Sequence, residues 1–384
     1  MKNGDEIGGY LLVSEPTNAG GGKCMWAFAE KDGAPYFLKR FLEPKIPRKG
    51  SGGSPESRRV REETCRAFEA RHRGIMDRLR PDAPGAGNLV LATDFFSEGS
   101  TYYKVTERID TSSLAEPHTL DARQKAVLLR TLVTSLRLLH AIDVVHGDLK
   151  PANVLVQRRG EAAFHTAKLI DFDDAYVAGE PPDRTEIAGD SLYGAPEWRR
   201  YVQGDPALDG AALTAAADVF ALGLMTHAYL TGELPGYDAE RYGSPADAVN
   251  AGERLAVDGR LSHAAAALVR AMTAADPAAR PRADEVLDAL KDPQVCALGA
   301  PRRESRLRVN LPGQQPPRAA RGPDPAAGSA PAPGRGTDPA PAADTPPAAD
   351  AAPRAAASRA TASRVRINLT GRDAPGGRPR PSER

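Results

Sequence analysis

The chain has 384 residues and a formal net charge of only +1, but its charges are unevenly distributed. Residues 301–384 contain 15 Arg, no Lys and 7 acidic residues, so this tail carries +8 and residues 1–300 carry −7. An acidic main part argues against nucleic-acid binding by that part. The chain also lacks any apolar run near the roughly 18 residues that a membrane helix needs, which predicts no membrane span.

Three short apolar runs open the chain and predict strands at residues 10–13, 25–29 and 36–41. Asp32-Gly33 predicts a hairpin turn between the second and third strands. Between the first two strands lies a stretch that contains Gly20, Gly21 and Gly22. Glycines in a hairpin let backbone N–H groups approach a phosphate closely.

Residues 44–57 are rich in Pro, Gly, Ser and Lys and predict a loop, and residues 56–80 predict a helix. The candidate buried positions of this helix are Val60, Phe68, Ile75, Met76 and Leu79. Residues 88–96 and 101–107 then predict a fourth and a fifth strand, joined by residues 97–100.

A second predicted helix, residues 120–142, precedes the most informative stretch of the chain. Its apolar residues recur at helical spacing and predict a core face: Leu128, Leu129, Leu132, Val133, Leu136 and Leu139. Further helices are predicted at residues 213–230, 264–272 and 283–291.

The stretch from Val145 to Val156 reads Val-His-Gly-Asp-Leu-Lys-Pro-Ala-Asn-Val-Leu-Val, and an apolar run ending in Asp171-Phe172-Asp173 follows it. Asp148 can accept a proton from an attacking hydroxyl, and Lys150 can neutralise a phosphate in transit. Asn153 and Asp171 offer the hard oxygen ligands that Mg²⁺ prefers. The alternative is that these residues are ordinary loop polars, but four such groups at these spacings favour phosphoryl transfer.

These motifs resemble the catalytic loop and the metal-binding loop of protein kinases. The resemblance covers about residues 8–292 and includes Ala195-Pro196-Glu197, Asp218 in a buried helix, and Arg280. It implies an α+β, bilobal protein-kinase fold: a small antiparallel β lobe with one helix (residues 1–109) and a larger, mainly helical lobe (residues 110–295). The structural roles it implies are a contact of Asp218 with the catalytic-loop backbone and an Arg280–Glu197 pair.

The resemblance also implies a serine/threonine protein kinase that uses ATP and Mg²⁺ and acts on protein substrates. The catalytic residues would be Asp148, Lys150 and Asn153, and the metal ligands Asn153 and Asp171. Lys39, 17 residues after Gly22, would hold the nucleotide phosphates, and Thr106 would lie at the back of the adenine pocket. The other expected ATP-binding residues are Gly20, Gly21, Gly22, Glu69, Glu107, Ile109 and Leu155.

An acid from the first helix should pair with Lys39, and the candidates are Glu62, Glu63 and Glu69. Glu62 and Glu69 are seven residues apart and share a helix face. Glu69 is preferred because it lies nearer the end of the helix that leads into the fourth strand.

The chain departs from the kinase pattern at several positions. Thr17 and Ala19 replace the first two loop glycines, and Phe37 replaces a small alanine above the adenine. Gly147 replaces the arginine that receives a phosphorylated activation loop, so we expect that phosphorylation of this loop is not the main switch. Asp173 replaces a glycine of the metal-binding loop, and Asp190 replaces a threonine of the activation segment. Asp190 is a candidate partner of Lys150.

From about residue 296 the chain becomes rich in Pro, Ala, Gly and Arg, and 16 of its 34 prolines follow residue 300. Such a composition predicts a disordered tail. Residues 305–313 and 363–371 nearly repeat one another and alternate apolar and polar residues. They are either a duplicated docking peptide for an acidic or sheet-edge protein partner or a basic linker.

Cys24, Cys65 and Cys296 are far apart, which argues against a disulfide framework or a zinc site. Residues 1–5 lack the apolar core of a signal peptide, so a cytoplasmic protein is expected, and the composition suggests a bacterial one. The phrases His-Gly-Asp-Leu-Lys-Pro and Ile-Asp-Phe-Asp-Asp-Ala also resemble bacterial kinases that accompany a von Willebrand-type protein and a phosphatase in stress-related gene clusters.

Two other functions are alternatives to protein phosphorylation. The first is a small-molecule kinase of the aminoglycoside or choline type, and the second is a weakly active scaffold with a docking tail. Lys150, Glu197, Asp218 and Arg280 argue against the first, and the intact Lys39, Asp148, Asn153 and Asp171 argue against the second.

Overall fold

The computed structural model describes residues 1–19, 22–48, 54–79, 86–109, 114–159 and 164–300. The tail repeats at 305–313 and 363–371, together with Gly20 and Gly21, lie outside the described residues. No helix in the described ranges is long and apolar enough to cross a lipid bilayer.

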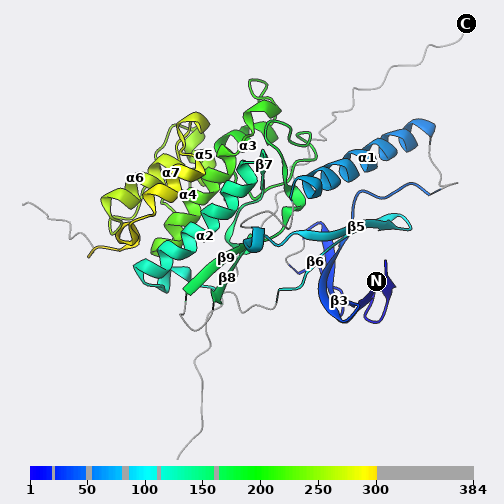
Figure 1. The fold of residues 1–384 in the computed structure, drawn as a ribbon. Helices are drawn as coiled ribbons and strands as arrows, with labels where there is room; N and C mark the ends of the chain where they lie inside the picture. Colours follow the sequence, from blue (N-terminus) through cyan, green and yellow to red (C-terminus); the bar gives the residue numbers. More distant parts are fainter. Residues whose placement is uncertain (20–21, 49–53, 80–85, 110–113, 160–163, 301–384) are drawn as a thin grey trace, which may run out of the picture. The chain divides into compact units, whose positions relative to one another are not determined.

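The N-terminal part is a six-stranded antiparallel sheet with strand order β1-β2-β3-β4-β6-β5 (Figure 1). Its strands are β1 (Glu6–Ile7), β2 (Tyr10–Leu12), β3 (Cys24–Lys31), β4 (Ala34–Phe41), β5 (Ala92–Glu98) and β6 (Thr101–Glu107). The predicted hairpin turn is confirmed, because Asp32 and Gly33 both have positive φ, at 52° and 76°.

One long helix, α1 (Pro55–Arg78), accompanies the sheet, and Ser54 caps it by accepting a hydrogen bond from the backbone N–H of Ser57. Its burial differs in part from the prediction. Ile75 and Leu79 are buried, but Val60 is 56% exposed. Another correction concerns the fourth strand, which begins at Ala92 rather than residue 88. Ala86–Asn88 forms a short 3₁₀ turn, and the next two residues contact Leu169 instead of β6.

The C-terminal part is mainly helical. Its helices are α2 (Ala122–His140), α3 (Pro196–Val202), α4 (Ala216–Thr231), α5 (Pro245–Asn250), α6 (His263–Met272) and α7 (Ala283–Ala289). The six apolar residues predicted to form the core face of α2 are all fully buried. They belong to one large hydrophobic cluster, to which α4 and α6 also contribute.

Two small antiparallel ribbons carry the loops of the site. The hairpin of β8 (Val154–Arg159) and β9 (Phe164–Leu169) lies beside α2 (Figure 1). The second ribbon pairs β7 (Val144–Val145) with β10 (Tyr176–Val177). The catalytic-loop stretch therefore connects β7 to β8, and the Asp171-Phe172-Asp173 stretch connects β9 to β10.

Candidate active site

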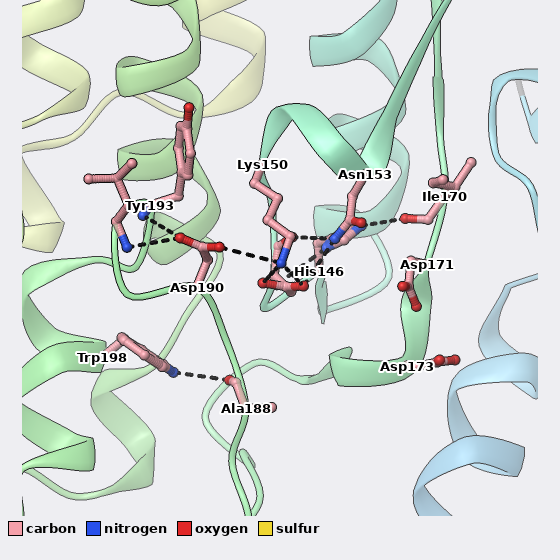
Figure 2. Close-up of polar contacts among 12 residues, drawn as sticks. His146, Lys150, Asn153, Ile170, Asp171, Asp173, Ala188, Asp190, Tyr193 and Trp198 are labelled. Atoms are coloured by element: carbon pink, nitrogen blue, oxygen red, sulfur yellow. Dashed lines mark hydrogen bonds and ion pairs between the residues drawn. The ribbon is translucent and has the colours of Figure 1, made fainter. Parts of the chain in front are cut away.

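Three polar side chains of the β7–β8 loop converge, as the sequence predicts. Lys150 Nζ lies 2.8 Å from Asp148 Oδ2. Asn153 Nδ2 donates to the carbonyl of Asp148 at 2.7 Å and to its Oδ2 at 3.1 Å. Asp148 is buried, and these donors fix both the backbone and the carboxylate of this expected catalytic residue. Figure 2 shows the side chains of Lys150 and Asn153 in this loop.

Asp218, on α4, binds the backbone of the β7–β8 loop. Its carboxylate accepts hydrogen bonds from the backbone N–H of His146 at 2.8 Å and of Gly147 at 3.2 Å, and it lies 3.0 Å from His140 Nε2. Burial raises the pKa of Asp218, but the contacts with His140 and His146 outweigh it and keep the pKa below its ordinary value. The predicted contact of Asp218 with the catalytic-loop backbone is confirmed.

Gly147 occupies a position that has no room for a side chain unless its neighbours move. Its φ is +77°, and a Cβ there would lie 2.5 Å from the carbonyl oxygen of Asp174 and 3.0 Å from the ring of Tyr176. The absence of an arginine at this position is therefore built into the conformation of the loop.

We expect Gly147→Ala to lower both stability and turnover, because the added methyl group must push the metal-binding loop away. The matched control is Gly204→Ala, since Gly204 has φ +83° and no heavy atom within 4 Å of a Cβ. The free energy of unfolding of Gly147→Ala should fall by about 1–3 kcal/mol more than that of the control. Equal losses, measured by denaturant titration, would contradict the close packing at Gly147.

The Asp171-Phe172-Asp173 stretch is joined to the catalytic loop by two hydrogen bonds. The backbone N–H of Ile170 donates to the carbonyl of Asn153 at 3.0 Å, and His146 Nε2 contacts the carbonyl of Ile170 at 3.1 Å. Asp171 adopts the left-handed region at φ 65°. Asp171 Oδ1 lies 2.7 Å from Lys39 Nζ, so the two residues form an ion pair across the site.

A cavity of about 440 Å³ lies between the sheet and these loops, a volume within the range of small-molecule sites. Its lining includes Trp26, Phe28 and Phe37, whose rings contact one another. Polar groups of the sheet and of the two loops also line it. The expected catalytic, metal-binding and ATP-site residues that line the cavity are Lys39, Thr106, Glu107, Ile109, Asp148, Lys150, Asn153, Leu155 and Asp171.

The expected pairing of Glu69 with Lys39 is wrong. Glu69 pairs with Arg73 at 2.9 Å, and Glu63 pairs with Arg59, both as i,i+4 pairs along α1. Glu62 is exposed. The described ion-pair partners of Lys39 are instead Asp171 and Asp173.

Two charged residues of the site, Lys104 and Asp173, are not among those that the sequence predicts. Lys104 on β6 lines the cavity and pairs with Asp173 at 2.9 Å. A signal for Lys104 was present, because it lies two residues before Thr106 and alternate residues of a strand share a face. Asp173 was recognised only as a departure from glycine, and it has no positive φ that would require one.

Asp174, the next residue, is also acidic. Burial raises its pKa to about 6, and the nearby charges of Asp148, Asp171 and Asp173 add to this effect.

The activation segment, residues 174–197, reaches the catalytic loop through Asp190. Asp190 Oδ1 accepts hydrogen bonds from the backbone N–H of Leu192 at 2.8 Å and of Tyr193 at 3.3 Å, while its Oδ2 lies 3.4 Å from Lys150 Nζ (Figure 2). The predicted candidate contact between Asp190 and Lys150 is confirmed. The end of the segment is anchored by Glu197, which forms the predicted pair with Arg280.

The donor set fits a magnesium–nucleotide complex. Asp171 Oδ1 is buried and, among the described residues, receives no well-aligned hydrogen bond, although Lys39 is close to it. The described residues contain no cluster of three or more His, Cys, Asp or Glu suited to a metal. Mg²⁺ commonly takes one or two protein ligands and completes its shell with phosphate and water, so Asp171 and Asn153 could hold it together with a nucleotide.

Comparison with known proteins identifies the class. The family description "Protein kinase domain" matches residues 69–290, which is more than half of the chain. The chain belongs to the protein kinase domain family.

Several curated serine/threonine-protein kinases are similar to the chain. GRIK2 of Arabidopsis thaliana is 29% identical over 241 residues, which is 61% of this chain and 54% of that protein. PkaA of Streptomyces coelicolor is 29% identical over 238 residues, 60% of this chain and 40% of that protein. Pkn1 of Myxococcus xanthus is 32% identical over 154 residues, 39% of this chain and 21% of that protein. The chain thus spans about half or less of the length of these relatives.

Proposed function

We propose that the protein transfers the γ-phosphoryl group of Mg-ATP to serine or threonine hydroxyls of proteins. The observation that carries this proposal is the contact of Lys150 with both Asp148 and Asp190. Through Lys150 it links the activation segment, the surface on which a polypeptide substrate of a kinase would lie, to the expected proton acceptor Asp148. The names of the similar proteins support the same activity.

Each residue of the loop has a role in this reaction. Asp148 orients the substrate hydroxyl and accepts its proton, and Asn153 fixes the Asp148 carboxylate by its 3.1 Å hydrogen bond. Lys150, 2.8 Å from Asp148 Oδ2, would neutralise charge on the phosphoryl group during its transfer. When bound, Mg²⁺ would supply charge neutralisation at the phosphates, with Asp171 and Asn153 as its protein ligands.

Burial alone would lower the pKa of Lys39, but Asp173 and Asp171 raise it above its ordinary value. Lys39 therefore remains a cation in the cavity at any physiological pH, as a phosphate-binding group must.

We expect Asp171→Ala to remove Mg-dependent turnover, because it removes the only carboxylate of the proposed ligand pair. Purified full-length protein should be offered a generic basic protein, an aminoglycoside and choline in parallel, with labelled ATP. Labelling of the protein by wild type, and its loss in Asp171→Ala, is the expected result. Labelling of the aminoglycoside or choline alone would contradict a protein substrate, and near-normal turnover by Asp171→Ala would contradict the metal site.

The finer features of the protein are also proposals. We infer lobes at residues 1–109 and 110–295 and a tail at 296–384, in a cytoplasmic bacterial protein. The similarity to kinases of Streptomyces coelicolor and Myxococcus xanthus supports a bacterial origin. We further propose that the protein acts beside a von Willebrand-type protein and a phosphatase, and that the tail repeats bind an acidic or sheet-edge partner.

A further inference from the structure

Two lysines lie directly opposite one another on adjacent strands of the sheet. Lys39 on β4 and Lys104 on β6 are register partners in the antiparallel ladder, so their side chains leave the same face of the sheet. Both are largely buried, with exposed fractions of 15% for Lys39 and 6% for Lys104. Like charges at directly opposite positions repel one another, and the repulsion is stronger where water is excluded. This arrangement requires an acid between them.

Asp173 is that acid. Its Oδ2 lies 2.9 Å from Lys39 Nζ, and its Oδ1 lies 2.9 Å from Lys104 Nζ, so each oxygen takes one lysine. The side chain of Asp173 is only 14% exposed. Burial opposes its ionisation, but Lys104 and Lys39 hold the pKa of Asp173 well below its ordinary value. The bridge therefore joins two strands of the sheet to the metal-binding loop.

Helix α1 faces the sheet with aromatic side chains, whereas the sequence predicts that Glu69 of this helix faces it. His72 of α1 is 3% exposed, and its ring lies 4.3 Å from Phe68, 5.0 Å from Phe95 and 5.1 Å from Phe41. Burial and the nearby Lys104 keep the pKa of His72 well below its ordinary value, so it adds no charge to the cluster. α1 contacts this region through packing, while Glu69 remains with Arg73 at its surface.

We propose that Asp173 is the positioning residue for Lys39, in the role expected of an acid from α1, and that Lys104 is the counter-charge that makes a buried Asp173 possible. The inference rests on the proposed function, because it concerns how Lys39 is presented to the nucleotide phosphates. Asp171 also pairs with Lys39, so two carboxylates balance the two lysines. When Asp171 binds a metal, Asp173 alone faces the two lysines, and one net positive charge is left for the nucleotide phosphates. Asp171 is then available to a metal without leaving Lys39 unheld.

With this arrangement, the position of Lys39 does not depend on an ion pair with an acidic residue of α1. Lys39, Lys104 and Asp173 belong to two adjacent strands and one loop, and each contact between them is short. A movement of α1 would disturb the aromatic packing around His72 but would break none of the ion pairs that hold Lys39.

The test compares Asp173→Asn with Glu69→Gln in the full-length protein. Asp173→Asn keeps the shape of the side chain and removes its charge, so kcat/KM for ATP should fall about 30-fold or more. The affinity for Mg-ATP, measured by calorimetric titration, should fall by at least about 10-fold. Glu69→Gln should change neither value by more than about twofold, because Glu69 lies at the helix surface with Arg73.

A third variant separates positioning from folding. In Lys104→Met with Asp173→Asn, the lysine repulsion and the unpaired Lys104 charge are both gone, so thermal stability should return toward that of wild type. Turnover should nevertheless stay low, because Lys39 then pairs only with Asp171, the proposed metal ligand. If turnover returns together with stability, Asp173 is only structural and the inference is overturned.

Different results would reject the proposed kinase function and the proposed role of Asp173. A wild-type protein that binds Mg-ATP tightly but phosphorylates nothing would reject the proposed function, and a weaker affinity in Asp173→Asn would still support the inference. Conversely, an active wild type in which Glu69→Gln abolishes turnover, or in which Asp173→Asn matches wild type, would reject the inference and leave the function intact.

Discussion

Asp148→Asn should lower kcat about 10²–10⁴-fold, the range that a positioned proton acceptor contributes. The amide has the same shape as the carboxylate but cannot take a proton from the attacking hydroxyl. It also loses the ion pair with Lys150 at 2.8 Å. The rate of phosphoryl transfer at saturating ATP and protein substrate measures the effect, and KM for ATP should change little.

The control for Asp148→Asn is Asp143→Asn, the same substitution just before the catalytic loop. Asp143 is exposed and has φ 56°, and asparagine tolerates this left-handed conformation. Asp143→Asn should keep near-normal turnover. If the two variants lose activity equally, Asp148 is not the proton acceptor, and the losses reflect damage to the loop.

Glu197→Gln should lower the free energy of unfolding by about 3–5 kcal/mol, because it leaves a buried guanidinium without its counter-charge. Arg280 donates to both carboxylate oxygens of Glu197, at 2.7 Å and 2.8 Å. The exposed fractions of the two side chains are 0% for Arg280 and 4% for Glu197. Arg280 also donates to the carbonyl of Ala216, so the pair joins the end of the activation segment to the start of α4.

Glu63→Gln is the matched control, since it removes the same charge from an ion pair of α1 with Arg59. Both partners there are more than half exposed, with fractions of 51% and 77%, so the loss should stay below about 0.5 kcal/mol. Chemical denaturation of both variants gives the comparison. A Glu197→Gln protein as stable as the control would show that the pair does not hold the segment.

Much of the site could be predicted because its residues lie close together along the chain. The spacing from Asp148 to Asn153 keeps three polar groups on one loop, and that loop places them within hydrogen-bond distance. The pairing of Arg280 with Glu197 spans a long stretch of sequence but was recoverable from the kinase pattern.

The partner of Lys39 could not be predicted, because it depends on how α1 is rotated and how closely it packs. The periodicity of residues 56–80 identifies a helix but does not decide whether an acid or His72 faces the sheet. The exposed Val60 shows the same difficulty, since an apolar residue at helical spacing need not be covered by another element. Lys104 and Asp173 were each visible as single residues, but their contact depends on the fold.

The most direct test of the central claim is a single labelling experiment. Full-length wild type and Asp148→Asn receive [γ-³²P]ATP, Mg²⁺ and a generic basic protein, and the phosphorylated residues are identified after acid hydrolysis. We expect phosphoserine or phosphothreonine with wild type and a signal at least about 100-fold lower with Asp148→Asn. Absence of label from wild type, or equal labelling by the two proteins, would contradict it.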